Sequence, residues 1–315
     1  MAQPNKLKPV DKVWVDGQLV PFNQAQVHVL THTLHYGLGA FEGIRAYKRA
    51  DGSGAIFRLA EHIDRLFESC HICTIDVPFT REQLVQACVE TMRANKMVEA
   101  YLRPIVFLGD GELGLGSLGN PVRTAICVYE WGAYLGEEGL RRGIRAKVSS
   151  FTRGGLNSNM SKGKICGQYV NSVLAKREAI KAGYSEAILL DDRGLVCEAS
   201  GENIFVIKKG RIKTPPLSSA ILAGITRDTV ITLAREHGVT VDETPFTRDE
   251  LYCADEVFFT GTAAELTPVR EIDDRRIGAG ECGPVTRKLQ DAYFEAVKGR
   301  AGQEKVAHPE WLTFV

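Results

Sequence analysis

The chain has 315 residues, of which 44% are hydrophobic, and its 39 Lys plus Arg residues balance 39 Asp plus Glu residues. This length suffices for two ordinary domains, and the composition is that of a globular protein. The zero net charge argues against binding to nucleic acid or a membrane surface, because no global basic field would attract either partner. The start lacks a signal-peptide core, and no run approaches the roughly 18 apolar residues of a membrane span, so we expect a cytoplasmic protein.

Turn and apolar patterns predict short strands and helices along the whole chain. The first half combines a hairpin with an Asp-Gly turn, further strands and two helices, which we place at residues 14–20, 55–59, 60–68, 82–95, 100–108 and 123–129. Residues 131–143 are rich in glycine and acid and form a candidate linker. The second half combines a β-meander with helices, which we place at residues 144–149, 167–181, 187–190, 195–198, 203–207, 211–213, 226–236, 256–259 and 284–297. Because strands cluster in hairpins, we predict an α+β fold with domains at residues 1–130 and 144–315.

Two patterns that often bind metal or support redox chemistry occur in unsuitable settings. Cys70 and Cys73 have C-x-x-C spacing, but they end a helical pattern and no second pair completes a zinc site, so we expect reduced, buried thiols. His28, His32 and His35 have the spacing of a metal-binding helix face. The β-branched residues between them favour extended or turning backbone, on which the histidines would not converge. We therefore expect no metal site.

Residues 109–114 match the G-x-G-x-x-G pattern of a dinucleotide site after a predicted strand. Gly116, Gly119 and Pro121 follow at once, so no helix can begin there and present its N-terminus to a pyrophosphate. We interpret the segment as a flexible loop of the kind that forms lids or interfaces.

Lys164 stands just before a predicted helix and differs from an ordinary solvated lysine by its neighbours. Gly163 and Gly167 allow close backbone approach, and Tyr169 can place a phenol near the amine. An amine in such a setting can form a Schiff base. By composition alone Lys162 is an equally good amine, so both lysines remain candidates at this point.

Glu198 ends an apolar strand, where a buried charge needs a partner. A protonated pyridine nitrogen would be such a partner, and a Schiff-base amine with an acid of this kind meets the needs of pyridoxal 5'-phosphate (PLP) chemistry. We expect the following Glu202 and Asn203 to form structural hydrogen bonds.

Two glycine-threonine segments could bind a phosphate group. Residues 223–228 begin a predicted helix and residues 261–264 end a predicted strand, and each offers backbone N–H groups and a threonine hydroxyl. Arg58 could add a positive charge. A second constellation of aromatic residues with arginines includes Tyr101 and Arg103, which share one face of a strand and suit a carboxylate with an apolar tail.

The chain resembles the branched-chain amino acid aminotransferases, which are fold-type IV PLP enzymes. Motifs similar to theirs occur in the family's order from about residue 13 to 297, namely LHYGLGAFEG, FRLAEH, AYLRP, WGAYLG, the Lys164 segment, SGENIF, TPP, GITRD and GTAAE. The family carries its lysine five residues before such a tyrosine, and this register selects Lys164 over Lys162. Gln168 and Ala223 stand where relatives often have asparagine and proline, which affects the expected loop shapes and not the chemistry.

This resemblance implies a smaller N-terminal α+β domain, a larger C-terminal PLP-binding domain, a cofactor site between them, and a homodimer or higher oligomer that completes the site. It implies that Lys164 is the catalytic residue. The residues expected to bind PLP are Arg58, Lys164, Tyr169, Glu198, Ile225, Thr226 and Thr262. The residues expected to contact the substrate are Tyr36, Phe41, Tyr101, Arg103, Trp131, Tyr134, Thr262 and Ala263.

We therefore expect transamination between branched-chain L-amino acids and 2-oxoglutarate, in a pocket that accepts both an alkyl chain and a second carboxylate. In this hypothesis Arg103, with Tyr36 and Tyr134, meets the distal carboxylate, and aromatic rings form the apolar wall. Alternatives of the same fold are a D-amino acid transaminase, an (R)-amine transaminase and aminodeoxychorismate lyase. Alternatives of another class are a PLP-binding regulatory protein and a structural relative that has lost the cofactor.

Overall fold

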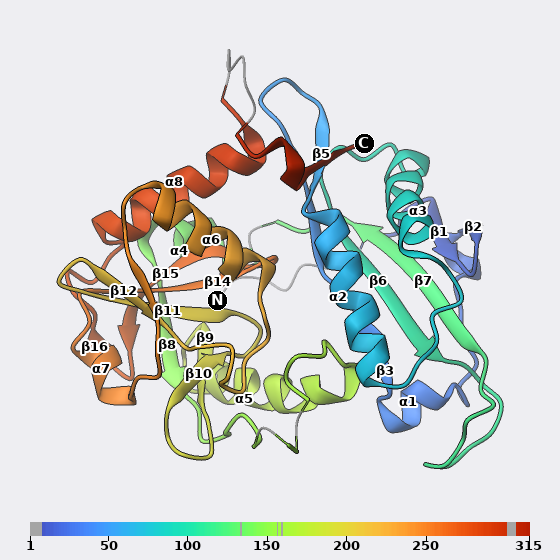
Figure 1. Cartoon of the computed structure of the whole chain (residues 1–315), viewed down its shortest axis with the longest axis horizontal. Coiled ribbons are helices and arrows are strands. Elements are labelled where there is room, and N and C mark those ends of the chain that lie inside the picture. The colour runs from blue at the N-terminus through green and yellow to red at the C-terminus, as the bar shows by residue number, and fades with distance from the viewer. Residues whose placement is uncertain (1–7, 133, 156, 159, 301–306) are drawn as a thin grey trace. The chain divides into compact units, whose positions relative to one another are not determined.

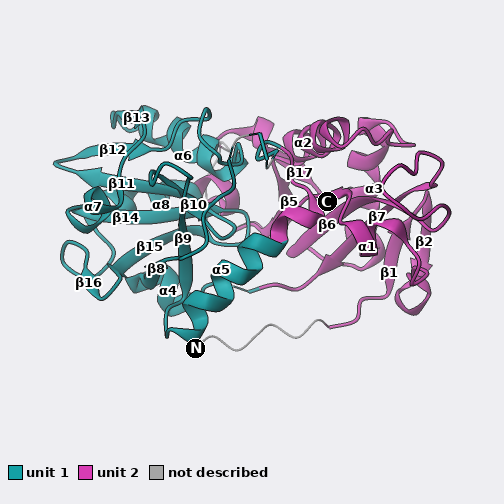
Figure 2. Ribbon diagram, turned by 90° about the horizontal axis from the view of Figure 1, so that it is seen from below, with its two compact units in different colours: residues 1–4, 132–162, 170–294 teal, residues 5–131, 163–169, 295–315 magenta. Residues whose placement is uncertain are grey.

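The computed structural model describes all residues except 1–7, 133, 156, 159 and 301–306. The chain divides into two compact units, shown in different colours in Figure 2. Unit 1 comprises residues 1–4, 132–162 and 170–294, and unit 2 comprises residues 5–131, 163–169 and 295–315.

Unit 2 is built on an eight-stranded sheet with the strand order β17-β5-β4-β6-β7-β1-β2, in which β3 also pairs with β6. The strands are β1 (Lys12–Val15), β2 (Gln18–Pro21), β3 (Gly39–Phe41), β4 (Ile44–Lys48), β5 (Gly54–Phe57), β6 (Ala100–Leu108), β7 (Val122–Tyr129) and β17 (Leu312–Phe314). The helical segments are η1 (Phe22–Gln24), α1 (His32–Tyr36), α2 (Leu59–Ile72), α3 (Arg81–Ala94), η2 (Cys166–Gln168) and η3 (Pro309–Trp311).

Helices α2 and α3 pack against this sheet through apolar faces (Figure 1). Along α2 the buried residues Leu59, Ile63, Leu66 and Cys70 recur every three or four positions, which is the spacing of one helix face. Helix α3 begins at a capping box, in which the Thr80 side chain accepts the backbone N–H three residues on. The packed helices hold the polar residues of α2 at fixed positions against β3.

Unit 1 is built on a nine-stranded sheet with the order β10-β9-β8-β15-β14-β11-β12-β13, and β16 pairs with β15. Strand β10 pairs with both β9 and β11, so the strands from β10 to β11 in this order form a closed ring. The strands are β8 (Ile144–Val148), β9 (Glu186–Leu190), β10 (Val196–Ala199), β11 (Asn203–Lys208), β12 (Arg211–Thr214), β13 (Val241–Glu243), β14 (Glu256–Gly261), β15 (Glu265–Ile272) and β16 (Arg275–Arg276). The helices are α4 (Glu137–Arg142), α5 (Tyr169–Lys181), α6 (Ile225–Glu236), α7 (Arg248–Tyr252) and α8 (Pro284–Lys298).

The α+β class predicted from the sequence is confirmed, and most predicted elements occur within a few residues of their expected bounds. Strands β3, β4, β13, β15, β16 and β17 and helices α1 and α7 were not predicted. The expectation of non-helical backbone around His32 was wrong for residues 32–36, because Gly37 at φ 73° closes one helical turn there. Helix α4 lies inside the expected linker, where two glutamates begin the helix and two arginines end it.

The compact units also differ from the expected domain ranges in two segments. Residues 163–169 belong to unit 2, where Ala40 forms a β-bridge with Ile165. Residues 295–315 also belong to unit 2, where β17 pairs with β5. Both pairings join residues far apart in sequence, which hydrophobic patterns do not reveal.

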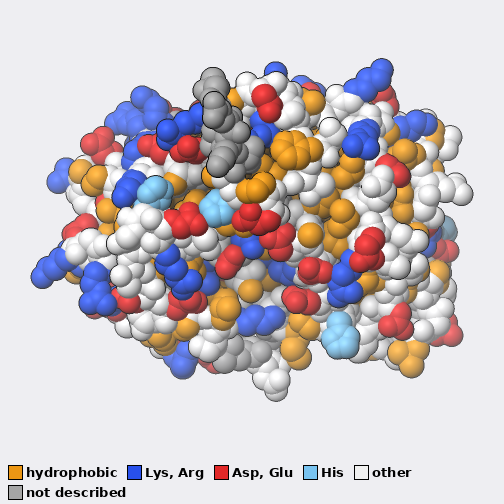
Figure 3. Space-filling model, turned by 45° about the horizontal axis from the view of Figure 1, so that its top comes forward, with side chains coloured by type: hydrophobic (Ala, Val, Ile, Leu, Met, Phe, Trp, Pro, Cys, Tyr) orange, Lys and Arg blue, Asp and Glu red, His pale blue; other side chains and the backbone are white. Residues whose placement is uncertain are grey.

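Positive and negative side chains are interspersed on the face shown in Figure 3, as the balanced composition predicts. None of the helices in the described part of the chain combines the length and the apolar composition needed to cross a membrane.

Candidate active site

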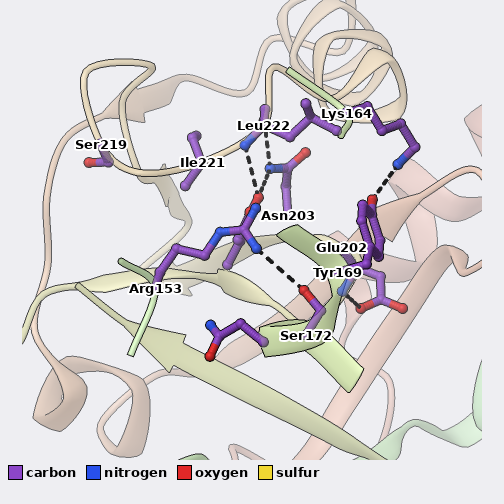
Figure 4. A network of polar contacts seen from close by, with 12 residues as sticks. Arg153, Lys164, Tyr169, Ser172, Glu202, Asn203, Ser219, Ile221 and Leu222 are labelled. Carbon is purple, nitrogen blue, oxygen red and sulfur yellow. Dashed lines mark hydrogen bonds and ion pairs between the residues drawn. The ribbon is translucent and has the colours of Figure 1, made fainter. Parts of the chain in front are cut away.

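The amine of Lys164 lies next to a phenol in unit 2. Lys164 Nζ donates a hydrogen bond of 2.6 Å to Tyr169 Oη (Figure 4). Tyr169 is the first residue of α5 and follows the short turn η2, which carries the chain round from the lysine to the tyrosine. The predicted approach of Tyr169 to Lys164 is thus present in the structure.

Backbone contacts fix the segment that carries Lys164. Phe41 N donates to Lys164 O at 3.1 Å, and Lys164 N donates to Ser69 Oγ on α2 at 2.9 Å. Gly167 N donates to Gly37 O at 2.9 Å, and a Cβ on Gly37 would lie only 2.7 Å from Gly167 Cα. The close backbone approach predicted at Gly167 therefore involves two glycines, since neither position leaves room for a side chain.

Phe41 brings the lysine together with an arginine. Its ring centroid lies 4.8 Å from that of Tyr169, 5.2 Å from Lys164 Nζ and 4.7 Å from Arg103 Cζ. Arg103 Cζ also lies 5.5 Å from the ring of Tyr101, as expected for residues two apart on β6. In unit 2, the Lys164 amine, the Arg103 guanidinium and the Tyr169 phenol thus surround the Phe41 ring. The Tyr101 ring adjoins this group through Arg103.

Trp131 joins this group through aromatic contacts. Its ring lies 4.5 Å from Tyr101 and 5.6 Å from Tyr129, and Arg45 Nη2 donates to its carbonyl at 2.6 Å. Burial raises the pKa of Tyr129 to about 12, so its phenol stays protonated at neutral pH. Tyr129 and Arg45 were not predicted to belong to the site. Tyr129 pairs with Tyr101 across β6 and β7, which a register prediction could have shown.

Gly43 explains how Tyr101 reaches this position. A Cβ on Gly43 would collide with the hydroxyl of Tyr101, so only glycine leaves room for the phenol.

A buried ion pair between Glu42, which directly follows β3, and helix α2 supports the same group and was not predicted. Glu42 accepts hydrogen bonds of 2.7 and 2.8 Å from Arg65 and of 2.7 Å from His62 Nδ1. Burial alone would raise the pKa of Glu42, but Arg65 and His62 hold it well below its usual range, so the carboxylate is ionised. Burial lowers the pKa of His62, which favours the neutral imidazole. Because Ser69 lies on the same helix, this ion pair fixes α2 against the strand that contacts the lysine.

Glu198 is a buried carboxylate in unit 1 with three hydrogen-bonding partners. Arg153 Nη2 lies 2.7 Å from Oε1, and Oε2 accepts from Asn203 Nδ2 at 3.0 Å and from Leu222 N at 3.1 Å (Figure 4). Arg153 was not predicted as a partner of Glu198, because the two residues are 45 positions apart in the chain and no local pattern relates them. The ion pair and the two N–H donors hold the carboxylate in a fixed orientation.

The two expected phosphate-binding segments also lie in unit 1. Gly224 is the N-cap of α6, and Ile225 and Thr226 occupy its first turn, which leaves the positive end of the helix dipole at this position. Thr262 and Ala263 form the turn between β14 and β15.

The remaining expected residues have the following positions. Arg58, in unit 2, begins α2 in the left-handed conformation, and its Nε donates to Glu61 at 2.8 Å. Tyr36 is 43% exposed on α1 in unit 2. Tyr134 is in unit 1, where its ring centroid lies 4.8 Å from Lys176 Nζ. Of the residues expected to touch substrate, Phe41, Tyr101, Arg103 and Trp131 are therefore grouped within one unit.

The patterns that suggested metal or dinucleotide binding have structural roles. His32 Nε2 lies 3.0 Å from Gly114 O, and His35 Nε2 lies 2.8 Å from Val29 O. Burial raises the pKa of Cys70 to about 12 and that of Cys73 to about 11, which makes both thiols unreactive. The glycine-rich residues 109–114 lie in the loop between the antiparallel strands β6 and β7, where no helix follows.

Comparison with known proteins agrees with the geometry. A family model described as "Amino-transferase class IV" matches residues 39–272. A branched-chain-amino-acid aminotransferase from Pseudomonas aeruginosa is 52% identical over 303 residues, which cover 96% of this chain and 97% of the relative. The chain belongs to the branched-chain amino acid aminotransferase family.

Two solved structures of a branched-chain amino acid aminotransferase from the organism abbreviated T.th. are similar over nearly the whole chain. One is complexed with N-(5'-phosphopyridoxyl)-L-glutamate, and it has a TM-score of 0.90 and 43% identity. The other is complexed with 4-methylvaleric acid, and it has a TM-score of 0.91 and 44% identity. Each alignment covers 98% of this chain and 99% of the T.th. chain. The fold-type IV architecture predicted from the sequence is thereby confirmed.

Proposed function

We propose that this protein transfers the amino group between branched-chain L-amino acids and 2-oxoglutarate with PLP as cofactor. The observation that carries the proposal is the cluster in unit 2, where Lys164 Nζ contacts a phenol and lies with Arg103 around the ring of Phe41. Such a cluster supplies a proton-transferring amine, an apolar surface and a cation for a carboxylate. These are the groups that amino-group exchange between an aliphatic and an acidic substrate requires.

The residues present fit PLP by their donor chemistry. Lys164 offers an amine for covalent attachment, Tyr169 a hydroxyl for the ring oxygen, and Glu198 a buried carboxylate for the ring nitrogen. The first turn of α6, the turn at Thr262 and Arg58 offer N–H groups, hydroxyls and a cation to the phosphate. When bound, PLP supplies a ring that withdraws electrons from the substrate Cα.

The protein's own groups handle the proton and the substrate charge. Lys164 Nζ takes the proton from the substrate Cα, and the hydrogen bond to Tyr169 directs the amine. The Arg153, Asn203 and Leu222 contacts orient the Glu198 carboxylate, which would hold the ring nitrogen of PLP and favour its protonated form.

We infer that the two substrates use different contacts of the proposed site residues. Tyr101 and the Thr262-Ala263 backbone bind the α-carboxylate common to both. An alkyl side chain packs against Phe41, Trp131 and the Tyr169 ring, whereas the second carboxylate of the diacid reaches Arg103, aided by Tyr36 and Tyr134. Two structures of the T.th. relative support this assignment, because one is complexed with a glutamate derivative and the other with a branched aliphatic acid.

We further propose a homodimer that acts in the cytoplasm. Support for the dimer comes from exposed leucines in the loop between β6 and β7, of which Leu115 is 90% and Leu118 95% exposed. Support for the location comes from the eight cysteines, all of which are unbridged thiols in the structure.

The proposal can be tested with purified protein reconstituted with PLP. Leucine, isoleucine or valine together with 2-oxoglutarate should give glutamate and the matching 2-oxo acid, and leucine alone should convert the cofactor's visible absorbance to that of the pyridoxamine form. D-alanine, an (R)-amine and aminodeoxychorismate should give far slower reactions. Pyruvate release from aminodeoxychorismate without an amino acceptor would instead identify a lyase, and a cofactor spectrum that no amino donor changes would indicate a protein without turnover.

A further inference from the structure

Two acidic residues, Glu186 and Glu202, are buried in unit 1 beside the turn that connects Glu198 to Asn203. Glu186 is fully buried and Glu202 is 5% exposed. Lys176 from α5 forms an ion pair with Glu186, and Glu202 lies close enough to Glu186 for their charges to interact. Ser200 Oγ donates to Glu186 at 2.6 Å.

This arrangement requires a proton that the mechanism above does not use. Two buried carboxylates opposite one ammonium group would leave one negative charge without a partner, and a proton on one of them removes that charge. The cluster contains two acids and one ammonium group, so a single retained proton makes it neutral. We propose that Glu186 and Glu202 share one proton opposite Lys176, and that this proton positions the β10–β11 turn and the β14–β15 turn for cofactor and substrate binding.

The surroundings of each group agree with this proton count. Burial, followed by the charge of Glu186, raises the pKa of Glu202 to about 8, although Lys176 opposes the shift. Burial would lower the pKa of Lys176, but Glu186 and Glu202 raise it above its usual value, so the ammonium remains charged. Burial and then Glu202 raise the pKa of Tyr134, so this phenol stays neutral. The pair is therefore singly protonated at neutral pH.

Glu202 links two turns through direct contacts. Its Oε2 accepts from Gly201 N at 3.0 Å and its carbonyl accepts from Ala199 N at 2.7 Å, which closes the β10–β11 turn. A Cβ on Gly261 would lie 3.3 Å from Glu202 Cγ, so Glu202 also packs against the end of β14 that leads into Thr262. A change in the charge of Glu202 would therefore affect the turn that follows Glu198 and the end of β14 that precedes Thr262.

Ionisation of Glu202 places a second negative charge beside Glu186. The two carboxylates then repel each other, which loosens both turns. Because the pKa of Glu202 is raised in the folded protein, protonation of Glu202 stabilises the folded state. This stabilisation is complete below the ordinary pKa of 4.5, decreases as the pH rises, and is lost above about 8. The effect of these turns on cofactor binding rests on the proposed function, whereas the shared proton does not.

Infrared difference spectroscopy of the complete protein during a pH titration tests the shared proton directly. The wild type should show a protonated-carboxyl band at pH 7 that disappears with a midpoint near 8, and Glu202→Gln should lack that band. Because the glutamine is neutral, the difference in Tm between wild type and Glu202→Gln should fall as the pH rises from 5 to 8 and then level off. An identical band and Tm profile in Glu202→Gln would overturn the proposal.

Two further glutamate variants make the test specific. Glu178→Gln changes an acid on α5 that bonds to Ser149 outside this cluster, and it should keep the band. Glu186→Gln leaves one carboxylate opposite Lys176, so it should also remove the band. A band that survives in Glu186→Gln would place the proton elsewhere and contradict the proposal.

The positioning role is measured by PLP affinity. From pH 7 to pH 9, wild type and Glu178→Gln should lose about tenfold more affinity than Glu202→Gln, which corresponds to roughly 1.4 kcal/mol. Equal losses in all three proteins would overturn the positioning role even if the infrared band behaves as expected. A protein that binds PLP without transaminating would refute the proposed function and leave the infrared and Tm results unaffected.

Discussion

At the scale of single residues, Lys164 and Lys162 differ in what their ammonium groups contact. Lys164 Nζ donates to a phenol in unit 2, whereas Lys162 Nζ donates to the carbonyls of Ser219 at 3.1 Å and Ile221 at 2.9 Å in unit 1. Lys162 therefore already has a structural role. The register that selected Lys164 from the sequence agrees with these contacts.

We predict that Lys164→Ala loses covalent PLP attachment and reduces kcat by on the order of a thousandfold or more, because the amine that transfers the proton is absent. Lys162→Ala should keep both attachment and most activity and lose only some thermal stability. Mass spectrometry after borohydride reduction locates the adduct, and finding it on Lys162 would refute the assignment.

Arg103 is the charged residue most directly tied to substrate choice. It is held between the rings of Phe41 and Tyr101 and is partly buried, which makes its charge available to a desolvated carboxylate. A partly buried guanidinium of this kind discriminates between an acidic and an alkyl side chain.

Arg103→Leu should impair the glutamate half-reaction by roughly tenfold to a hundredfold more than the leucine half-reaction, since a hydrogen bond to a charged group contributes about 1.5–3 kcal/mol. Single-turnover conversion between the PLP and pyridoxamine forms follows each half-reaction separately. Arg123→Leu on neighbouring β7, which removes a surface ion pair with Asp16, is the control and should change neither. Equal losses for leucine and glutamate in Arg103→Leu would move the arginine to the common α-carboxylate.

The sequence named candidate chemical residues but not the residues that support them. Lys164, Glu198 and Arg103 were named from their local settings together with the family resemblance. Arg153 and Arg65 were missed because each pairs with an acid that is distant in the chain, Glu198 and Glu42 respectively. An arginine whose partner is defined only by the tertiary fold has no local signal.

At the scale of elements, the predictions succeeded where periodicity is strong and failed where contacts define the structure. Strands β6 and β7 and helices α2 and α3 followed from apolar patterns of sufficient length. Strand β3 has only three residues, all buried, so it shows no alternation. Its position is defined by pairing with β6, which joins residues more than sixty apart.

The loop between β6 and β7 exposes large apolar side chains of the kind that protein interfaces bury. Leu113, Leu115 and Leu118 are 54%, 90% and 95% exposed there. The same loop contacts α1 through His32 and Gly114, and Leu34 on α1 is 63% exposed. Several large apolar side chains on adjoining segments indicate a protein interface.

We predict that the double variant Leu115→Ser/Leu118→Ser weakens dimerisation by at least about tenfold, because burying one leucine contributes roughly 1.5–3 kcal/mol. Sedimentation velocity across a concentration series measures the change. Ile180→Ser, at a 44% exposed position on α5, is the matched control and should leave the dimer intact. An unchanged dimer in the double variant would place the interface elsewhere.

At the scale of the whole molecule, the chain alternates between its two units around Lys164. Residues 163–169 belong to unit 2, while the residues before and after them belong to unit 1. Lys164 and Glu198 are therefore assigned to different units although they lie close in sequence. Domain ranges based on composition could not show this, because the segment is defined by its contacts with β3 and α2.

A mixed-dimer experiment tests whether the loop completes the site of a second copy. Neither Lys164→Ala nor a variant in which residues 112–119 are replaced by a short turn should be active alone. Because the replacement also removes Leu115 and Leu118, the two proteins are mixed at a concentration high enough for the weakened dimer to form. If the loop acts in its partner's site, a mixed dimer has one site with both an intact lysine and an intact loop. Random exchange should then restore about a quarter of wild-type activity, since half of the dimers are mixed and each has one complete site. Native mass spectrometry verifies that mixed dimers form, and their formation without recovered activity would show that each subunit works with its own loop.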